Sequence, residues 1–381
     1  MKIGIVGAGP AGLYGAYLLK RARPDADIRI VEQNPADATF GFGVVFSEQA
    51  LGFLARDDPE THAYITPHME AWNDLTVVHR DIAIPIDGVG FTAIGRLRLL
   101  RLLQDRVRSV GIEPRFESPL SSLDAFADAD LIIGADGVNS LVRSSYAAEF
   151  GSTVTHGSNK FIWYGVAKSY PTLTQTFRET DYGALTVHHY RYAPERSTFL
   201  VEADAPTWQR TGFDRMDEAA TRAYCEQVFA PELDGHRLVA NKSIWRNFPV
   251  VHNQKWRVDN KVLVGDALHT AHFSIGSGTR LAMEDVIALV RALGEHPGSV
   301  RDALESYEAS RRQIVETLVK AANASLSWYE HMAEHMRLAP HDFVYSYITR
   351  SGRISDERLR QIAPSFMATY EQYRGSAATR S

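Results

Sequence analysis

The chain has a single cysteine, Cys225, among its 381 residues. One thiol cannot form a disulfide within the chain, so nothing points to an oxidising compartment, and a cytoplasmic location is expected. Cys225 lies in the helical pattern TRAYCEQVF without a glycine or a basic cluster beside it. This setting favours a structural thiol over a reactive one.

The sequence also lacks long apolar runs and an excess of positive charge. No stretch approaches the roughly 18 apolar residues of a membrane-spanning helix. The N-terminal apolar run is broken by glycines and a proline, which argues against a signal peptide. Lys and Arg number 41 against 46 Asp and Glu, for a formal net charge of −5. Whole-chain nucleic-acid binding needs a concentrated basic surface and is not expected. No metal site is predicted.

The pattern of elements predicts an α/β protein of two domains. Residues 2–6 and 27–32 are typical of buried strands, and residues 10–23 between them of a helix. The segments 129–137 and 261–267 return to the parallel-strand pattern. β-rich material near 73–93 and 155–250 interrupts this pattern, and the chain after residue 274 is almost entirely helical. A nucleotide-binding domain with an inserted sheet has this organisation.

A glycine-rich turn follows the first strand. Gly7, Gly9 and Gly12 form GxGxxG at the start of a helix. The first glycine permits a tight turn, the second lets the backbone approach a pyrophosphate, and the third lets helix and strand pack closely. Glu32 lies 20 residues after Gly12, at the end of the second strand, where an acid accepts hydrogen bonds from ribose.

A second glycine-dotted segment comes about 250 residues later. The strand KVLVGDA ends on Gly265 and Asp266, and Gly276 and Gly278 precede a helix that starts near Thr279. Asp266 can accept a hydrogen bond from a polyol such as ribitol, and the glycines permit close approach to a flat ring. The helix N-terminus favours negative charge on that ring. Two such segments indicate one long dinucleotide held at both ends, which favours FAD over NAD.

A third segment, GADGVNSLVR, places Asp136 and Gly137 just after a buried strand. These residues are candidates for contact with the dinucleotide. Alternatively, Asp136 is the N-cap of a helix, and both roles are compatible.

These three segments, in this order, resemble the group A flavoprotein aromatic hydroxylases, to about residue 345. FGFGVVFS, KFIWYG, STFLVE and HTAHFSIGSGT resemble one subgroup, which contains the salicyloyl-CoA 5-hydroxylases, a violacein-pathway hydroxylase and the flavin domain of anthraniloyl-CoA monooxygenase. The similarity to salicyloyl-CoA 5-hydroxylase is strongest. Phe273 and Arg280 depart from the wider family, where a proline and an asparagine are common, and leave the flavin-ring contacts open.

The resemblance implies a para-hydroxybenzoate-hydroxylase-like fold: a Rossmann-type FAD-binding domain, an inserted β-sheet domain for the substrate and a helical C-terminus. The expected boundaries are 1–72, 93–154 and 255–325 for the FAD domain, 73–92 and 155–254 for the substrate domain, and 326–381 for the helical segment. The expected FAD-binding residues are Gly7, Gly9, Pro10, Ala11, Gly12, Glu32, Gln33, Val44, Val45, Arg96, Asp136, Gly137, Gly265, Asp266, Gly276, Gly278 and Thr279.

The implied activity is hydroxylation of an electron-rich aromatic ring. NADH or NADPH reduces the FAD, O2 gives a flavin C4a-hydroperoxide, and its distal oxygen attacks the ring. The expected reaction converts salicyloyl-CoA to 2,5-dihydroxybenzoyl-CoA (gentisyl-CoA). Alternatives are an indole, tryptophan-derived or aminobenzoyl substrate, or a flavoprotein that serves only as a redox sensor or partner subunit. The expected state is a monomer or a homodimer.

Such a reaction needs a group that accepts or shares the phenolic proton. His188 and Tyr190 lie on one face of the predicted strand GALTVHHYRY and His189 on the other. The resemblance favours the face of His188 and Tyr190 as the catalytic one. His272 is a third catalytic candidate, and His269 is expected to brace the loop.

Several further residues have two interpretations. Phe42, Val44, Val45 and Phe46 either wall the pocket or belong to the core. The C-terminal aromatic set of Trp328, Tyr329, Met332 and Met336 is expected to serve in packing or in a dimer contact. Phosphates of a CoA thioester need basic side chains, and the sequence does not choose among the candidates Arg56, Arg80, Arg191 and Arg196.

Overall fold

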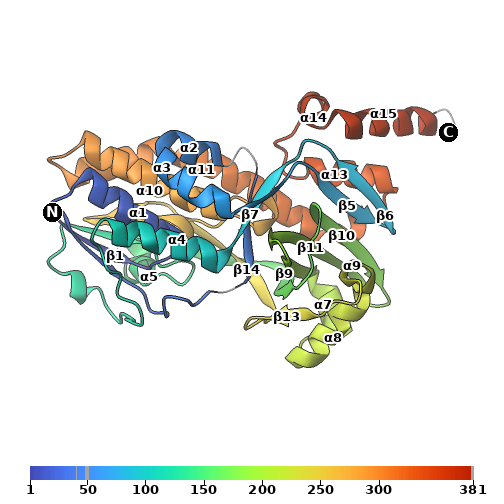
Figure 1. The fold of residues 1–381 in the computed structure, drawn as a ribbon, viewed down its shortest axis with the longest axis horizontal. Helices are drawn as coiled ribbons and strands as arrows, with labels where there is room; N and C mark the ends of the chain where they lie inside the picture. The colour runs from blue at the N-terminus through green and yellow to red at the C-terminus, as the bar shows by residue number, and fades with distance from the viewer. Residues whose placement is uncertain (40, 48–50, 379–381) are drawn as a thin grey trace.

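The computed structural model describes residues 1–39, 41–47 and 51–378, and within these residues the strands form three sheets (Figure 1). The first sheet has the order β15-β16-β8-β1-β2. Its strands are β1 (Lys2–Val6), β2 (Asp27–Val31), β8 (Leu131–Gly134), β15 (Arg257–Val258) and β16 (Lys261–Leu263). All neighbours pair in parallel except β15 with β16. Because parallel strands are buried on both faces, their sequences are nearly continuous apolar runs.

Helices cover this first sheet. They are α1 (Pro10–Ala22), α4 (Arg96–Ser109), α10 (Gly278–Glu295) and α11 (Val300–Glu330), with the shorter α2 (Gly52–Asp57), α3 (Pro59–Ile65), α5 (Leu141–Ser145) and α6 (Ala147–Phe150) around them. Figure 1 shows α1, α10 and α11 together at the N-terminal end of the molecule. Their apolar faces and the strands form one large buried cluster.

The second sheet runs β13-β9-β12-β11-β10-β5-β6, with β14 paired to β9. Its strands are β5 (Leu75–His79), β6 (Ile82–Ile86), β9 (Ser152–Val166), β10 (Leu173–Thr180), β11 (Gly183–Ala193), β12 (Arg196–Ala203), β13 (Leu238–Ala240) and β14 (Arg246–Asn253). Helices α7 (Ala205–Thr211), α8 (Glu218–Val228) and α9 (Ala230–Leu233) lie beside it in Figure 1. Two chain segments distant in sequence therefore build one sheet, and the division into domains stays a prediction.

A small third sheet has the order β3-β7-β4, and its strand β7 lies between the two larger sheets in Figure 1. It consists of β3 (Gly43–Ser47), β4 (Glu70–Trp72) and β7 (Phe91–Gly95). β7 leads directly into α4, so this sheet positions the first residue of that helix, Arg96. The Arg96 N–H donates to the carbonyl of Phe42 over 2.8 Å.

The C-terminal helices pack on the second sheet. They are α12 (Met332–His335), α13 (Pro340–Thr349), α14 (Asp356–Ile362) and α15 (Pro364–Ala378). The aromatic set Trp328, Tyr329, Met332 and Met336 is buried in the cluster between these helices and the sheet, which is the packing interpretation. Cys225 is fully buried on α8. Among the described residues, no helix is long and apolar enough to cross a membrane.

Candidate active site

A cavity of about 690 Å³ is lined by residues of the second and third sheets, of the loops that follow β1, β8 and β16 of the first sheet, and of the C-terminal helices. Its size is within the range of about 300–1,000 Å³ that is usual for small-molecule sites. Gly9 at the N-terminal turn and Gly278 at the start of α10 both line it. The two glycine-rich segments therefore meet at one cavity, although Gly9 and Gly278 are about 270 residues apart in the sequence.

The N-terminal turn has the geometry that its glycines predict. Gly7 has φ of +100°, and its N–H donates to the carbonyl of Val31 over 2.8 Å. A Cβ on Gly12 would lie 1.9 Å from the Gly7 carbonyl oxygen, so only glycine fits there. Helix α1 begins at Pro10, and its N-cap, Gly9, provides no side-chain acceptor. The N–H groups of the first turn are thus left for a ligand, and they favour an anion.

The second segment leaves β16 through a short turn, Gly265–Ala267, and reaches the N-terminus of α10, which also has no side-chain cap. Asp285, on α10, holds this turn from behind and has no exposed surface. It accepts from the Gly265 N–H over 3.1 Å, lies 2.8 Å from His269 Nε2, and accepts from Arg311 Nε over 3.1 Å. The predicted bracing role of His269 is confirmed.

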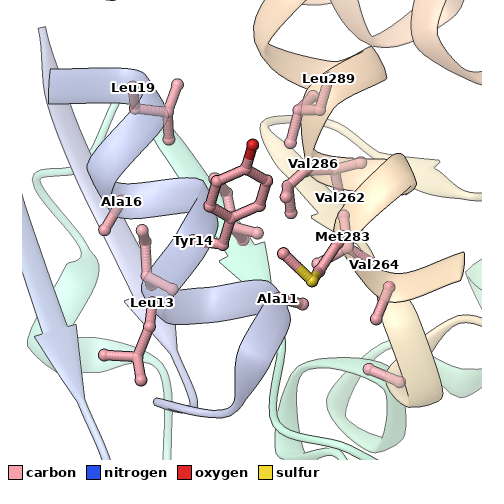
Figure 2. Packing of buried hydrophobic residues seen from close by; sticks show 14 of the residues in the cluster. Ala11, Leu13, Tyr14, Ala16, Leu19, Val262, Val264, Met283, Val286 and Leu289 are labelled. Carbon is pink, nitrogen blue, oxygen red and sulfur yellow. The ribbon is translucent and has the colours of Figure 1, made fainter. Parts of the chain in front are cut away.

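Direct packing of α1 on α10 holds the two segments together. Figure 2 shows Ala11 and Tyr14 of α1 facing Met283 and Val286 of α10. A Cβ on Gly15 would lie 3.2 Å from Val286, so the helices approach closely at that point. The apolar contact between α1 and α10 therefore sets the distance between the two glycine-rich segments on the cavity wall.

Arg96 and Asp266 are opposite charges on the cavity wall. Desolvation within the cavity lowers the pKa of Arg96 and raises the pKa of Asp266, and each group partly offsets the shift of the other. The cavity also has three glycines, Gly9, Gly137 and Gly278, at which an added Cβ would meet no protein atom within 4 Å. A ligand can press against the backbone at these positions. The uncapped helix ends, the open glycines and the polar pair together fit FAD.

Not every predicted FAD-binding residue lies on the cavity. Those that do are Gly9, Pro10, Ala11, Val44, Val45, Arg96, Gly137, Asp266, Gly276, Gly278 and Thr279. Gly7, Gly12 and Gly265 act through the backbone geometry behind it. Gln33 is exposed beyond it. Glu32 lies outside the lining, and its carboxylate accepts from the N–H groups of Ala8 and Asn34, each over 2.9 Å.

Asp136 also lies outside the lining, and its carboxylate serves the start of α5. It accepts from the N–H groups of Leu141 over 2.6 Å and Val142 over 3.2 Å. The N-cap position itself belongs to Ser140, whose hydroxyl accepts from the N–H of Arg143. The N-cap prediction for Asp136 is thus wrong by four residues, although the same N–H groups are satisfied.

The end of the cavity at the second sheet is a mostly apolar chamber. Its walls are Leu75, Phe161, Trp163, Leu173, His188, Tyr190, Leu200, Phe248 and Phe273. Phe273 contacts Phe161 edge to face, with ring centroids 5.0 Å apart. His189 points away into another core cluster, where its ring lies 4.1 Å from that of Tyr170. The alternation of β11 therefore places His188 and Tyr190, and not His189, on the chamber.

His188 has a buried acidic neighbour that the sequence analysis missed, Glu202 on β12. His188 Nε2 lies 4.0 Å from Glu202 Oε2, and both atoms are buried without a hydrogen-bond partner among the described residues. Asn159 donates to the other carboxyl oxygen of Glu202 over 2.8 Å. Burial lowers the pKa of His188 well below its usual value and raises the pKa of Glu202 to about 8. An acid in the apolar strand STFLVE was the signal that could have revealed it.

Tyr190 and His272 are placed less favourably for proton transfer. The Tyr190 hydroxyl donates to the carbonyl of Gly43 over 3.0 Å and so anchors β3. His272 lies behind Phe273, outside the lining, with Nδ1 2.7 Å from the hydroxyl of Ser274. Burial lowers the pKa of His272 to about 3. Their catalytic roles stay predictions, and of the three candidates His188 has the clearest access to the chamber.

Of the remaining residues predicted to wall the pocket, the structure places some on the cavity and others in the core. Val44 and Val45 line the cavity, Phe46 is buried in the core, and Phe42 packs on Gly165. Phe40, which begins the FGFGVVFS motif, lies outside the described residues. The candidate phosphate ligands Arg56, Arg80, Arg191 and Arg196 are all absent from the lining. The guanidinium of Arg191 is occupied by Glu70 and by the carbonyls of residues 71, 170 and 171.

Comparison with known proteins identifies the family of this site. Residues 126–322 match the model of the FAD-binding domain family. The chain is 42% identical to a salicyloyl-CoA 5-hydroxylase from Streptomyces sp, over 92% of this chain and 70% of that protein. It is 36% identical to a 3-hydroxy-4-methyl-anthranilyl-[aryl-carrier protein] 5-monooxygenase from Streptosporangium sibiricum, over 93% and 95% of the two chains.

The fold comparison agrees with the sequence comparison. The structure of 2-methyl-3-hydroxypyridine-5-carboxylic acid oxygenase superposes with a TM-score of 0.71 at 17% identity, covering 95% of this chain and 96% of the other. At that identity the likeness concerns the fold alone. The predicted fold class and the resemblance drawn from the motifs are confirmed.

Proposed function

The chain belongs to the family of FAD-dependent aromatic monooxygenases, and from that premise we propose that it hydroxylates an aromatic acyl-CoA. The first candidate is salicyloyl-CoA, with 2,5-dihydroxybenzoyl-CoA as the product. The observation that carries the proposal is the continuity of one cavity from the uncapped ends of α1 and α10 to the apolar chamber at His188. A dinucleotide and an aromatic ring can occupy such a cavity together.

The residues around the two helix ends hold the cofactor in this proposal. The first-turn N–H groups of α1 receive the pyrophosphate, and Asp266 and Arg96 contact the polar parts of the ribityl chain and flavin. Bound FAD, once reduced by NADH or NADPH, supplies the activation of O2. The protein contributes binding, orientation and a dry surrounding to that chemistry.

The apolar chamber orients the substrate ring and excludes water. Phe161, Trp163, Phe248 and Phe273 present flat apolar surfaces to it. Exclusion of water matters because water at the reacting centre would let the activated oxygen escape as H2O2 before the substrate is hydroxylated. The proposal therefore expects tight coupling of NAD(P)H consumption to hydroxylation when the chamber is filled by the correct ring.

In this proposal His188 accepts a hydrogen bond from the phenolic hydroxyl of the substrate and so shares its proton. Because burial lowers its pKa well below the usual value, its imidazole is neutral at pH 7 and has a lone pair to offer. Nε2 is directed toward Glu202, which leaves Nδ1 for the substrate hydroxyl. Sharing that proton increases electron density at the carbon para to the hydroxyl, which is the carbon to be hydroxylated.

A second candidate substrate is an aminobenzoyl thioester on an aryl-carrier protein. The relative that is 36% identical over nearly its whole length is named for such a substrate. An amino group supplies the ring with a lone pair in the same way as a phenol does, so the chamber chemistry is unchanged. The two candidates differ in what carries the thioester.

The direct test is NADH and NADPH oxidation by the FAD-loaded protein with a panel of substrates. The panel contains salicylate, salicyloyl-CoA, anthraniloyl-CoA, an aryl-carrier-protein thioester and an indole. We expect only thioesters to stimulate oxidation and to yield a product heavier by one oxygen atom. Stimulation by free indole alone, or a purified protein that takes up no FAD, would overturn the proposal.

His188→Gln tests the proton acceptor, and His189→Gln on the opposite face of the same strand is the matched control. We expect kcat for hydroxylation to fall by about 10²- to 10⁴-fold in the first variant, with NADH oxidation diverted to H2O2. The control should keep wild-type coupling once its folding is verified. Equal coupling in both variants would exclude His188 from this role.

A further inference from the structure

The cavity has an outer end on the C-terminal helices. Among the described residues that line it, only Gly88, Asp266, Arg353 and Arg358 are exposed, and Asp266 belongs to the flavin loop. Gly88 lies in the turn between β6 and β7, while Arg353 and Arg358 lie before and on α14. The mouth is therefore bounded by this turn on one side and by residues 350–362 on the other.

The wall at the mouth is firmly anchored. Both carboxyl oxygens of Asp87 accept backbone N–H groups at the start of α15, from Ser365 over 3.1 Å and from Phe366 over 2.9 Å. The backbone fits so closely that a Cβ on Gly88 would lie 1.9 Å from the carbonyl oxygen of Ile362. Arginines on this wall thus have defined positions relative to the cavity.

The charge of the cavity is opposite to that of the chain. Among the described residues, the lining has five arginines (Arg96, Arg280, Arg350, Arg353 and Arg358) and one carboxylate, Asp266, whereas the whole chain has a formal net charge of −5. Arg96 faces Asp266, and Arg280 is paired with Glu284 over 2.8 Å. These two interactions account for Arg96 and Arg280, and Arg350, Arg353 and Arg358 remain to be explained.

The arginines near the mouth differ in how they are engaged. The guanidinium of Arg350 donates to Ser325, to the Tyr347 carbonyl and to the Ser274 carbonyl, so it is structural. Within the described part of the chain, Arg353 and Arg358 form no ion pair with a carboxylate. Arg358 contacts only the neutral amide of Gln361 over 3.2 Å. These two side chains are available to bind phosphate.

We propose that Arg353 and Arg358 bind the phosphate of a phosphopantetheine arm that enters the cavity at this mouth, with its thioester-linked ring in the chamber at His188. This inference rests on the proposed function, since it assumes a thioester substrate. CoA and a carrier protein share this arm, and therefore both present a phosphate to the same pair of arginines. The apolar lining beside them, Ile354 and Ile362, accommodates the uncharged pantetheine.

The test uses the FAD-loaded double variant Arg353→Gln and Arg358→Gln, because glutamine retains much of the side-chain volume. Arg360→Gln is the matched control: it removes an exposed arginine of α14 that is absent from the cavity lining and pairs with Glu371. The substrates are salicyloyl-CoA, salicyloyl-pantetheine, which lacks phosphate, and a salicyloyl carrier protein. We expect KM for salicyloyl-CoA to rise about 10-fold with kcat unchanged, and KM for salicyloyl-pantetheine to stay at the wild-type value.

Direct binding of CoA, measured by calorimetry, should weaken by the same factor and lose most of its salt dependence. A loss with both CoA and carrier protein supports the proposal, because the phosphopantetheine phosphate is the one that they share. A loss with CoA alone overturns it, because the two arginines would then bind the nucleotide phosphates of CoA. Equal KM values for the double variant, the control and the wild type with salicyloyl-CoA overturn it while leaving the proposed function intact. Activity on free aromatics and on no thioester instead refutes the proposed function itself.

Discussion

Glu202→Gln is expected to stabilise the protein progressively as the pH rises from 5 to 8. Glu202 is 1% exposed, and burial raises its pKa to about 8 from the ordinary 4.5. Between these two values the folded protein keeps the proton while the unfolded chain has lost it. The unfolded state then binds fewer protons, so the free energy of unfolding falls as the pH rises. Glutamine resembles the neutral acid and removes this penalty.

The magnitude follows from the size of the shift. At about 1.36 kcal/mol per pH unit, a pKa displaced from 4.5 to about 8 costs the wild type up to about 5 kcal/mol at pH 8 and almost nothing below pH 4.5. With an unfolding entropy of about 2.1 cal/mol/K per residue over 381 residues, this corresponds to roughly 6 °C in melting temperature.

The assay is thermal unfolding of both proteins at saturating FAD, at half-unit steps between pH 5 and 8. The variant should melt close to the wild type at pH 5 and above it at pH 8. Glu179→Gln, which replaces an exposed carboxylate on β10 of the same sheet, is the control and should leave the pH profile unchanged. A constant difference between Glu202→Gln and the wild type would show that the gain or loss comes from packing, and would refute the argument from ionisation.

Three further outcomes are expected. Gly12→Ala should reduce FAD content severely, because its Cβ would lie 1.9 Å from the Gly7 carbonyl oxygen. The control Gly294→Ala, in open space on α10, should retain FAD and stability. Equal FAD content in the two variants, read from absorbance, would contradict this. Asp285→Asn should lower the free energy of unfolding at pH 7 by about 3 kcal/mol in chemical denaturation. The loss should be smaller at acid pH, because His269 and Arg311 hold the pKa of Asp285 below its ordinary value despite burial, and its stabilising charge is lost as the pH falls. An unchanged denaturation midpoint at pH 7 would argue against the bracing role of Asp285. Cys225 should resist alkylation until the protein unfolds, because burial raises the pKa of its thiol, and mass spectrometry of the native protein treated with iodoacetamide checks this.

The helices, strands and turns could be predicted from the types and spacing of neighbouring residues. The central first-sheet strands β1 and β8 are nearly continuous apolar runs, and the turn at Gly7 demands a positive φ. Both features could therefore be predicted from residue types alone. The strand alternation of β11 likewise placed His188 and His189 on opposite faces. Motif similarity covered nearly the whole chain and predicted the cofactor, the fold class and the enzyme family.

Tertiary structure decided which side chains meet. Glu32 and Asp136 are in the predicted positions, but neighbouring backbone N–H groups occupy their carboxylates. Glu202 faces His188 only because β12 pairs with β11 in one register. The arginines at the cavity mouth come from the C-terminal segment, which no local pattern connects with β6 and β7. The sequence by itself determined the local conformations and the chemistry available, because these depend on near neighbours. Which charges are buried, paired or left open depends on contacts between distant segments, and these only the folded chain brings about.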